Sequence, residues 1–231
     1  MPPSAVSRLT QSAVARPVIT HEERPARDTA GPKGRTAIVL LHSRAGDEHE
    51  VLPWLHDLDP EERHLGLLPL APLDLHAEER HWYLIEREAS PDPATFLANL
   101  EALSEWLDRT LAVRGIDSDR TVLAGFSQGA AMAYSLGLAP GRPSPAGILA
   151  FSGYIPRVEG FDLDLEGRAR LPVSIAHGSL DPTVSVGFGR EARDRLESAG
   201  LAVRYHEDPA GHSITPGGLV HARAVLGEAL A

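Results

Sequence analysis

Short apolar runs recur along the chain, and each is bounded by glycine, proline or polar residues. Continuous short runs of this kind are typical of strands that a sheet buries on both faces. We therefore expect buried strands at residues 36–42, 64–72, 121–126, 146–151 and 173–177, a less buried strand at 201–205, and a peripheral strand at 17–21.

Between these runs, apolar residues recur with the period of a helix. In the clearest helix, apolar residues spaced three or four apart share one face: Phe96, Leu100, Leu103, Leu107 and Leu111. Asp92 suits its N-cap, Pro93 its first turn, and Gly115 its end. Further helices are expected at residues 50–58, 130–139, 186–199 and 216–230. Because strands and helices alternate, the pattern predicts an α/β fold with a mostly parallel central sheet flanked by helices on both faces.

The domain organisation is expected to be simple. Residues 1–35 are interpreted as an N-terminal leader with a peripheral strand, and residues 36–231 as one domain. The leader lacks the apolar segment of a signal peptide. Two long segments, 74–92 and 152–171, show no clear period and are expected to shape the pocket.

Composition narrows the function. The net charge of −10 argues against nucleic acid as a partner, because phosphates attract lysine and arginine. The absence of cysteine excludes disulfides, thiolate catalysis and cysteine-ligated zinc, and it suits the cytoplasm. The acidic and histidine residues at 47–57 match no compact ligand set, so we expect neither a metal nor a cofactor. No apolar run is long enough for a membrane span, which leaves a small molecule as the expected partner, with a homodimer left open.

One motif carries the candidate chemistry. Gly125, Ser127 and Gly129 lie where a predicted strand turns into a predicted helix. The two glycines permit a close backbone approach, and the serine between them is exposed above the sheet edge at the positive end of the helix. This is the position of a nucleophile.

A base and an orienting acid follow in the same setting. Asp181 comes directly after the strand at 173–177, and His212 lies in a glycine-containing loop after the next strand. The order Ser127, Asp181, His212 is the order expected for an α/β-hydrolase. In this interpretation Ser127 attacks, His212 accepts its proton, and Asp181 orients His212. Each residue also has a structural alternative, as a helix cap, a turn former or a solvated histidine.

An oxyanion site needs two N–H donors near the serine. The backbone N–H of Gln128 is one candidate, and the other is expected from Ser43 or Arg44, with Arg44 preferred. His42 is interpreted as a buried histidine that holds this loop.

The substrate pocket is expected to involve Ser43, Trp82 and Val184. For Trp82, with its neighbour Tyr83, a plain hydrophobic cover over the core is an equal alternative.

Three segments together resemble the phospholipase/carboxylesterase family of α/β-hydrolases, which includes the acyl-protein thioesterases. The segments are Gly125–Ala130, His177–Val184 and Gly211–Ile214, which are similar to the family's G-F-S-Q-G, H-G-x-x-D-P-V-V and G-H-x-I patterns. The resemblance implies a small serine hydrolase without a large cap, acting on carboxylic esters or thioesters. One departure stands out: His42-Ser43-Arg44-Ala45 occupies the place of the family's His-Gly-x-Gly.

Two hypotheses follow. The first is a carboxylesterase that hydrolyses small or medium acyl esters, with thioesters or lysophospholipids as further substrates, through an acyl-enzyme. The second is a ligand-binding or regulatory protein that has lost catalysis, suggested by the altered loop at 42–45.

Overall fold

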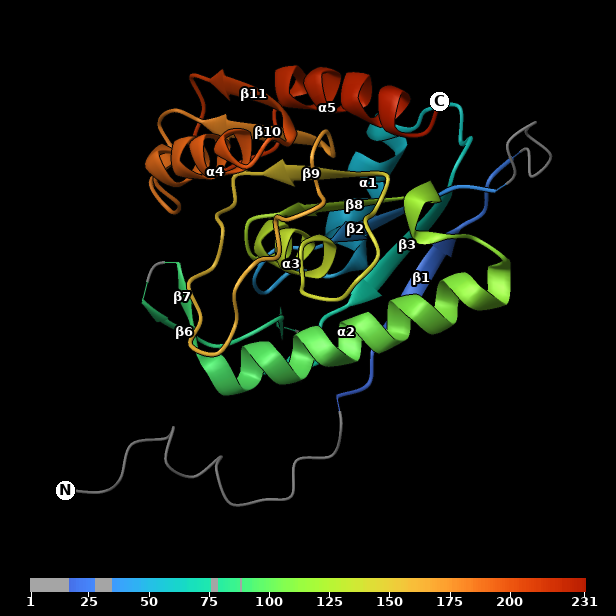
Figure 1. Cartoon of the computed structure of the whole chain (residues 1–231), viewed down its shortest axis with the longest axis horizontal. Coiled ribbons are helices and arrows are strands. Elements are labelled where there is room, and N and C mark those ends of the chain that lie inside the picture. The colour runs from blue at the N-terminus through green and yellow to red at the C-terminus, as the bar shows by residue number, and fades with distance from the viewer. Residues whose placement is uncertain (1–16, 28–34, 76–78, 88) are drawn as a thin grey trace.

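The computed structural model describes residues 17–27, 35–75, 79–87 and 89–231, and its centre is a seven-stranded sheet (Figure 1). The strand order is β1-β3-β2-β8-β9-β10-β11, in which only the pairing of β1 with β3 is antiparallel. The strands are β1 Thr20–Arg24, β2 Ala37–Leu41, β3 Leu65–Leu70, β8 Thr121–Phe126, β9 Gly147–Phe151, β10 Pro172–Gly178 and β11 Ala202–Asp208. The expected mostly parallel sheet is confirmed.

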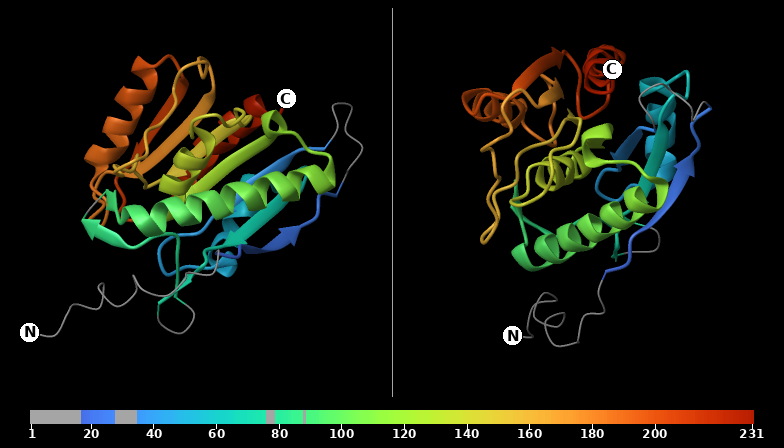
Figure 2. Two further views of the ribbon diagram at one scale, coloured as in Figure 1. Left: turned by 60° about the horizontal axis from the view of Figure 1, so that its bottom comes forward. Right: turned by 45° about the vertical axis from the view of Figure 1, so that its right-hand side comes forward.

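Helices cover both faces of this sheet (Figure 2). The helices are α1 Glu48–Leu58, α2 Pro93–Arg114, α3 Gln128–Gly137, α4 Val186–Ser198 and α5 Pro216–Ala229, with a short 3₁₀ helix at Ser118–Arg120. As predicted, Asp92 caps α2 by accepting from the Thr95 N–H, and Gly115 ends it with φ +63°. No cap domain is present among the described residues.

The two faces of the sheet bury two separate cores. In β2, Ala37, Val39 and Leu41 belong to one core cluster with residues of α2, α3 and α4. Ile38 and Leu40 point the other way and pack with α1 and α5. A strand that is buried on both faces has a continuous apolar sequence, so β2 could be predicted from the sequence.

Two segments differ from the expectation. The peripheral strand lies later than predicted, at Thr20–Arg24. Its last residue is a buried arginine, which a search for apolar residues could not find. Arg24 forms an ion pair with the buried Asp59. The segment expected to be irregular contains two small antiparallel pairs, β4 Leu73–Asp74 with β5 Arg80–His81, and β6 Ile85–Arg87 with β7 Ser90–Pro91. The leader at 1–16 lies outside the described residues.

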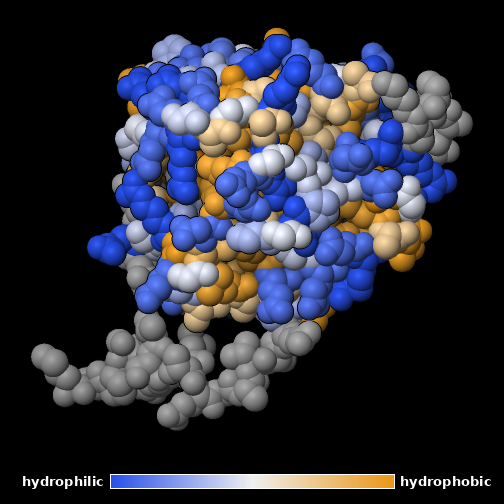
Figure 3. Space-filling view, in the orientation of Figure 1, coloured by the Kyte–Doolittle hydropathy of each residue, from blue (hydrophilic) through white to orange (hydrophobic). Residues whose placement is uncertain are grey.

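Hydrophilic residues dominate the face shown in Figure 3, and apolar residues show between them in separate patches. In the described ranges, no helix is long and apolar enough to cross a membrane.

Candidate active site

Ser127 occupies the turn between β8 and α3 in a strained conformation. Its φ of +55° and ψ of −115° lie where few residues with a side chain are found. Such a conformation costs on the order of 1–3 kcal/mol and persists only where the surroundings impose it. Here the Ser127 N–H donates to the Phe151 carbonyl (2.9 Å), and its own carbonyl accepts from Ala130 and Ala131.

The flanking glycines make this turn sterically feasible. A Cβ on Gly125 would collide with the backbone of Gly129 and Ala130. A Cβ on Gly129 would collide with the carbonyl oxygens of Leu41 and His42. The turn therefore packs directly against the end of β2, which brings the loop after β2 beside Ser127.

Ser127, His212 and Asp181 are hydrogen-bonded in series. The Ser127 Oγ lies 2.9 Å from the His212 Nε2, and the His212 Nδ1 lies 2.7 Å from the Asp181 Oδ2. Their chain positions differ widely, but β8, β10 and β11 run parallel, so the segments after them meet at one sheet edge. The Phe126 ring packs against the His212 ring, with 4.8 Å between the ring centroids.

The Asp181 carboxylate is fully buried and its second oxygen is fixed. Its Oδ1 accepts from the N–H groups of Thr183 (2.8 Å) and Val184 (2.9 Å). Behind it lies His177, whose Nε2 donates to the Val184 carbonyl (2.9 Å) and is 3.6 Å from the Asp181 Oδ2. Burial lowers the pKa of His177, which keeps its ring neutral. Asp181 is thereby oriented toward His212.

His42 holds the loop after β2, as the sequence suggested. It is completely buried, and its Nε2 accepts from the Ala71 N–H (3.0 Å) while its Nδ1 donates to the Ser43 carbonyl (2.7 Å). Burial lowers its pKa to about 4, so the ring is neutral at ordinary pH.

The loop at residues 43–46 keeps a backbone suited to glycine although it contains side chains. Ala45, where the family pattern has its second glycine, has φ +61°. Three of the four loop N–H groups are engaged: Ser43 donates to Glu50, Ala45 to the Arg80 carbonyl, and Gly46 to the Ser43 carbonyl. In the described part of the chain, this leaves the Arg44 N–H without an acceptor, while the Arg44 side chain is exposed.

Gln128 contributes more than the N–H expected of it. That N–H belongs to the first turn of α3, where a helix leaves its donors unsatisfied. The buried Gln128 side chain accepts from the Trp82 N–H (2.8 Å) and donates to the Tyr83 carbonyl (2.9 Å). Sequence reasoning missed this link, because 46 residues separate Gln128 from Trp82.

The expected pocket residues are engaged in other contacts. Trp82 is completely buried, and its indole N–H donates to the His42 carbonyl (2.9 Å), so it is part of the core rather than an open pocket wall. Val184 is also buried, and its backbone supports Asp181 and His177. Ser43 is half-buried, but its hydroxyl donates to the Glu50 Oε1 (2.7 Å).

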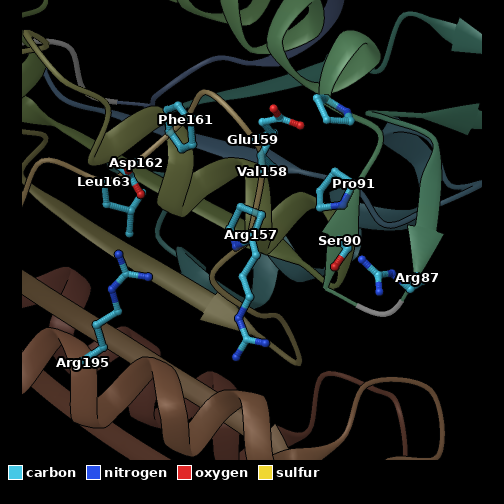
Figure 4. A pocket seen from close by; sticks show the side chains of 12 residues that line it. Arg87, Ser90, Pro91, Arg157, Val158, Glu159, Phe161, Asp162, Leu163 and Arg195 are labelled. Atoms are coloured by element: carbon cyan, nitrogen blue, oxygen red, sulfur yellow. The ribbon is translucent and has the colours of Figure 1, made fainter.

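A cleft of about 720 Å³ is lined by other residues (Figure 4). Its lining comes from both long segments that the sequence expected to shape a pocket, from the first residue of α2 and from α4: Arg87, Ser90, Pro91, Pro93, Pro156, Arg157, Val158, Glu159, Phe161, Asp162, Leu163 and Arg195. Gly153 packs against Ser127, since a Cβ there would lie 3.3 Å from the Ser127 carbonyl oxygen. Pro156, which lines the cleft, follows three residues later, so its Cα lies at most about 11 Å from that of Gly153.

The parallel sheet and the serine, histidine and aspartate at its edge define an α/β-hydrolase fold. Comparison with solved structures supports this. The Bacillus cereus carboxylesterase has a TM-score of 0.78 at 26% identity, covering 91% of this chain and 94% of that one. Esterase PE8 has a TM-score of 0.79 at 28% identity, covering 92% and 100%.

The family follows from sequence comparison. A family model described as phospholipase/carboxylesterase matches residues 69–227, so the chain belongs to that family, as predicted. Acyl-protein thioesterase 1 of Neurospora crassa is 38% identical over 103 residues, which are 43% of this chain and 42% of that protein. The alignments with the first curated relatives span only 42% to 62% of those relatives' length. The prediction of a carboxylic ester hydrolase agrees with this family.

Proposed function

We propose that this protein is a serine carboxylesterase that hydrolyses small or medium acyl esters through an acyl-enzyme. The observation that carries the proposal is the series of hydrogen bonds from the strained Ser127 through His212 to the buried Asp181. A serine hydroxyl is a weak nucleophile without a base, and this arrangement places one within hydrogen-bond reach.

In the proposed reaction, the Ser127 Oγ attacks the ester carbonyl carbon while the His212 Nε2 takes up the hydroxyl proton. The tetrahedral intermediate then expels the alcohol, which receives that proton from His212. Water attacks the acyl-enzyme with His212 again as base, releases the carboxylic acid and restores Ser127. Asp181 accepts a hydrogen bond from the His212 Nδ1–H throughout and stabilises the imidazolium.

The oxyanion site of this proposal consists of the backbone N–H groups of Gln128 and Arg44. Gln128 contributes a donor at the positive end of α3. In the loop at 43–46, the Arg44 N–H is the donor left over when the hydrogen bonds among the described residues are assigned. Two such donors would stabilise the charge that develops on the ester oxygen.

Steady-state hydrolysis of p-nitrophenyl butyrate tests the proposal. Ser127→Ala should lower kcat at least about 10⁴-fold. Ser135→Ala is the matched control, because Ser135 lies on the same helix and its hydroxyl donates to the Ala131 carbonyl. Equal turnover by wild type and Ser127→Ala would contradict the proposal, and ligand binding without turnover by the wild type would favour the non-catalytic alternative.

The acyl preference belongs to the same proposal. A series of p-nitrophenyl esters from acetate to laurate, with matching thioesters, measures the preferred length directly, since each added methylene reports one further increment of apolar contact. We expect kcat/KM to be highest for short or medium chains.

A further inference from the structure

Glu50 makes contacts unusual for its place in a helix. It is the third residue of α1, whose N-cap is Asp47. In a capping box, a glutamate at this position accepts from the backbone N–H of the N-cap residue. Here the Glu50 carboxylate instead reaches Ser43, four residues before the cap. Its Oε2 accepts from the Ser43 N–H (2.9 Å) and its Oε1 from the Ser43 hydroxyl (2.7 Å).

The helix does not need Glu50 for its own cap. The Asp47 Oδ1 accepts from the Glu50 N–H (3.0 Å), so the N-cap side chain already serves the first turn. The negative charge of Glu50 lies at the positive end of α1, where it is stabilised. Its carboxylate is therefore available to bind the loop between β2 and α1.

The peptide group between Ser43 and Arg44 is held at its carbonyl by His42 and Gly46, and Glu50 holds the rest of Ser43. The Ser43 carbonyl accepts from the His42 Nδ1–H (2.7 Å) and the Gly46 N–H (3.3 Å), while Glu50 holds the nitrogen and the hydroxyl of the same serine. A trans peptide is planar, with its N–H opposite its C=O. Anchoring the Ser43 carbonyl on one side therefore sets the direction of the Arg44 N–H on the other.

We propose that Glu50 is a positioning residue that acts through Ser43 to hold the Arg44 N–H in place as an oxyanion donor. The inference rests on the function proposed above. It also gives a physical role to the departure from His-Gly-x-Gly: the serine that replaces the first glycine supplies a second hydrogen bond to Glu50. A donor that acts on the developing oxyanion contributes to kcat more than to substrate binding.

The variant Glu50→Gln tests this role. Its carbonyl oxygen can still accept from the Ser43 N–H, and its amide can donate to the Ser43 hydroxyl oxygen once that hydroxyl turns away, so the variant replaces two hydrogen bonds to a carboxylate with two weaker neutral ones. We expect kcat for p-nitrophenyl butyrate to fall about tenfold, with KM changed less than about twofold. Glu48→Gln is the matched control, because it removes the same charge from the same helical turn and should leave both constants unchanged.

Ser43→Ala is the second variant, since it removes only the hydroxyl donor, and it should lower kcat about tenfold. In the double variant Glu50→Gln/Ser43→Ala, the losses should be clearly less than multiplicative, because both changes break one contact. If Glu50→Gln does not fold, the kcat of Ser43→Ala alone tests the role of Glu50.

The outcomes separate the two proposals. If turnover depends on Ser127 but kcat is unchanged in Glu50→Gln, the role of Glu50 is overturned and the proposed function is not. If only Ser43→Ala folds, an unchanged kcat in that variant has the same meaning. A loss confined to KM, or an equal loss in Glu48→Gln, also overturns it. If the wild type shows no turnover that depends on Ser127, the proposed function is overturned, and the role of Glu50 with it.

Discussion

The buried His42 should make the stability of the fold depend on pH. Burial, the largest cause, lowers the pKa of His42 from its ordinary value of 6.5 to about 4 in the folded protein. The difference corresponds to about 3 kcal/mol between the two protonation states. As the pH falls below about 6.5, the unfolded chain takes up a proton on this ring and the folded chain does not. The stabilisation is therefore complete above about pH 6.5 and is lost progressively as the pH falls toward about 4.

Urea unfolding of the wild type and His42→Gln at pH 7.5 and pH 4.5 tests this sign and size. Glutamine offers one acceptor and one donor in place of the ring nitrogens but does not titrate. The wild type should be the more stable at pH 7.5, and its advantage should shrink by about 2–3 kcal/mol at pH 4.5. Other histidines with a lowered pKa, such as the buried His177 and the half-buried His64, titrate in both proteins and cancel in the difference. An advantage of the same size at both pH values would refute the reasoning.

Three further substitutions follow from the geometry. Asp181→Asn should lower kcat about 10³–10⁴-fold with little loss of stability, because the backbone donors keep an oxygen acceptor while His212 loses its anionic partner; an unchanged kcat would contradict the role of Asp181. Gly129→Ala should destabilise the protein by at least about 3 kcal/mol in urea unfolding, whereas Gly227→Ala, where a Cβ meets nothing within 4 Å, should not destabilise it. Ala45→Gly should be neutral or stabilise by up to about 1 kcal/mol in the same assay, since φ +61° is strained for alanine; a loss above about 1 kcal/mol would argue against that conformation.

Much of the fold could be predicted from the sequence, because the residues that define each strand and each helix end are close together in the chain. A strand buried on both faces must be apolar throughout, and helix ends carry recognisable residues such as Asp92 and Gly115. The approach of Ser127, Asp181 and His212 followed from one topological rule, that segments after parallel strands meet at one edge. Each of these signals lies within one short stretch of chain.

The rest of the site depends on contacts that no local pattern encodes. Glu50 is at the position where a capping-box glutamate would bind the N-cap residue, yet it binds Ser43. Trp82 carried no signal to distinguish a pocket wall from core, and its burial depends on Gln128 and His42 from other segments. The pairs β4–β5 and β6–β7 are too short for an alternation of apolar residues to be recognised.

The central claim is that Ser127 is the nucleophile, and covalent labelling with a fluorophosphonate tests it most directly. Intact-mass measurement should show one adduct per chain in the wild type, and fragmentation should place it on Ser127. Ser127→Ala should remain unmodified under the same conditions, and Ser135→Ala should be labelled like the wild type. An absence of labelling in the wild type, or an equal adduct in Ser127→Ala, would contradict the account.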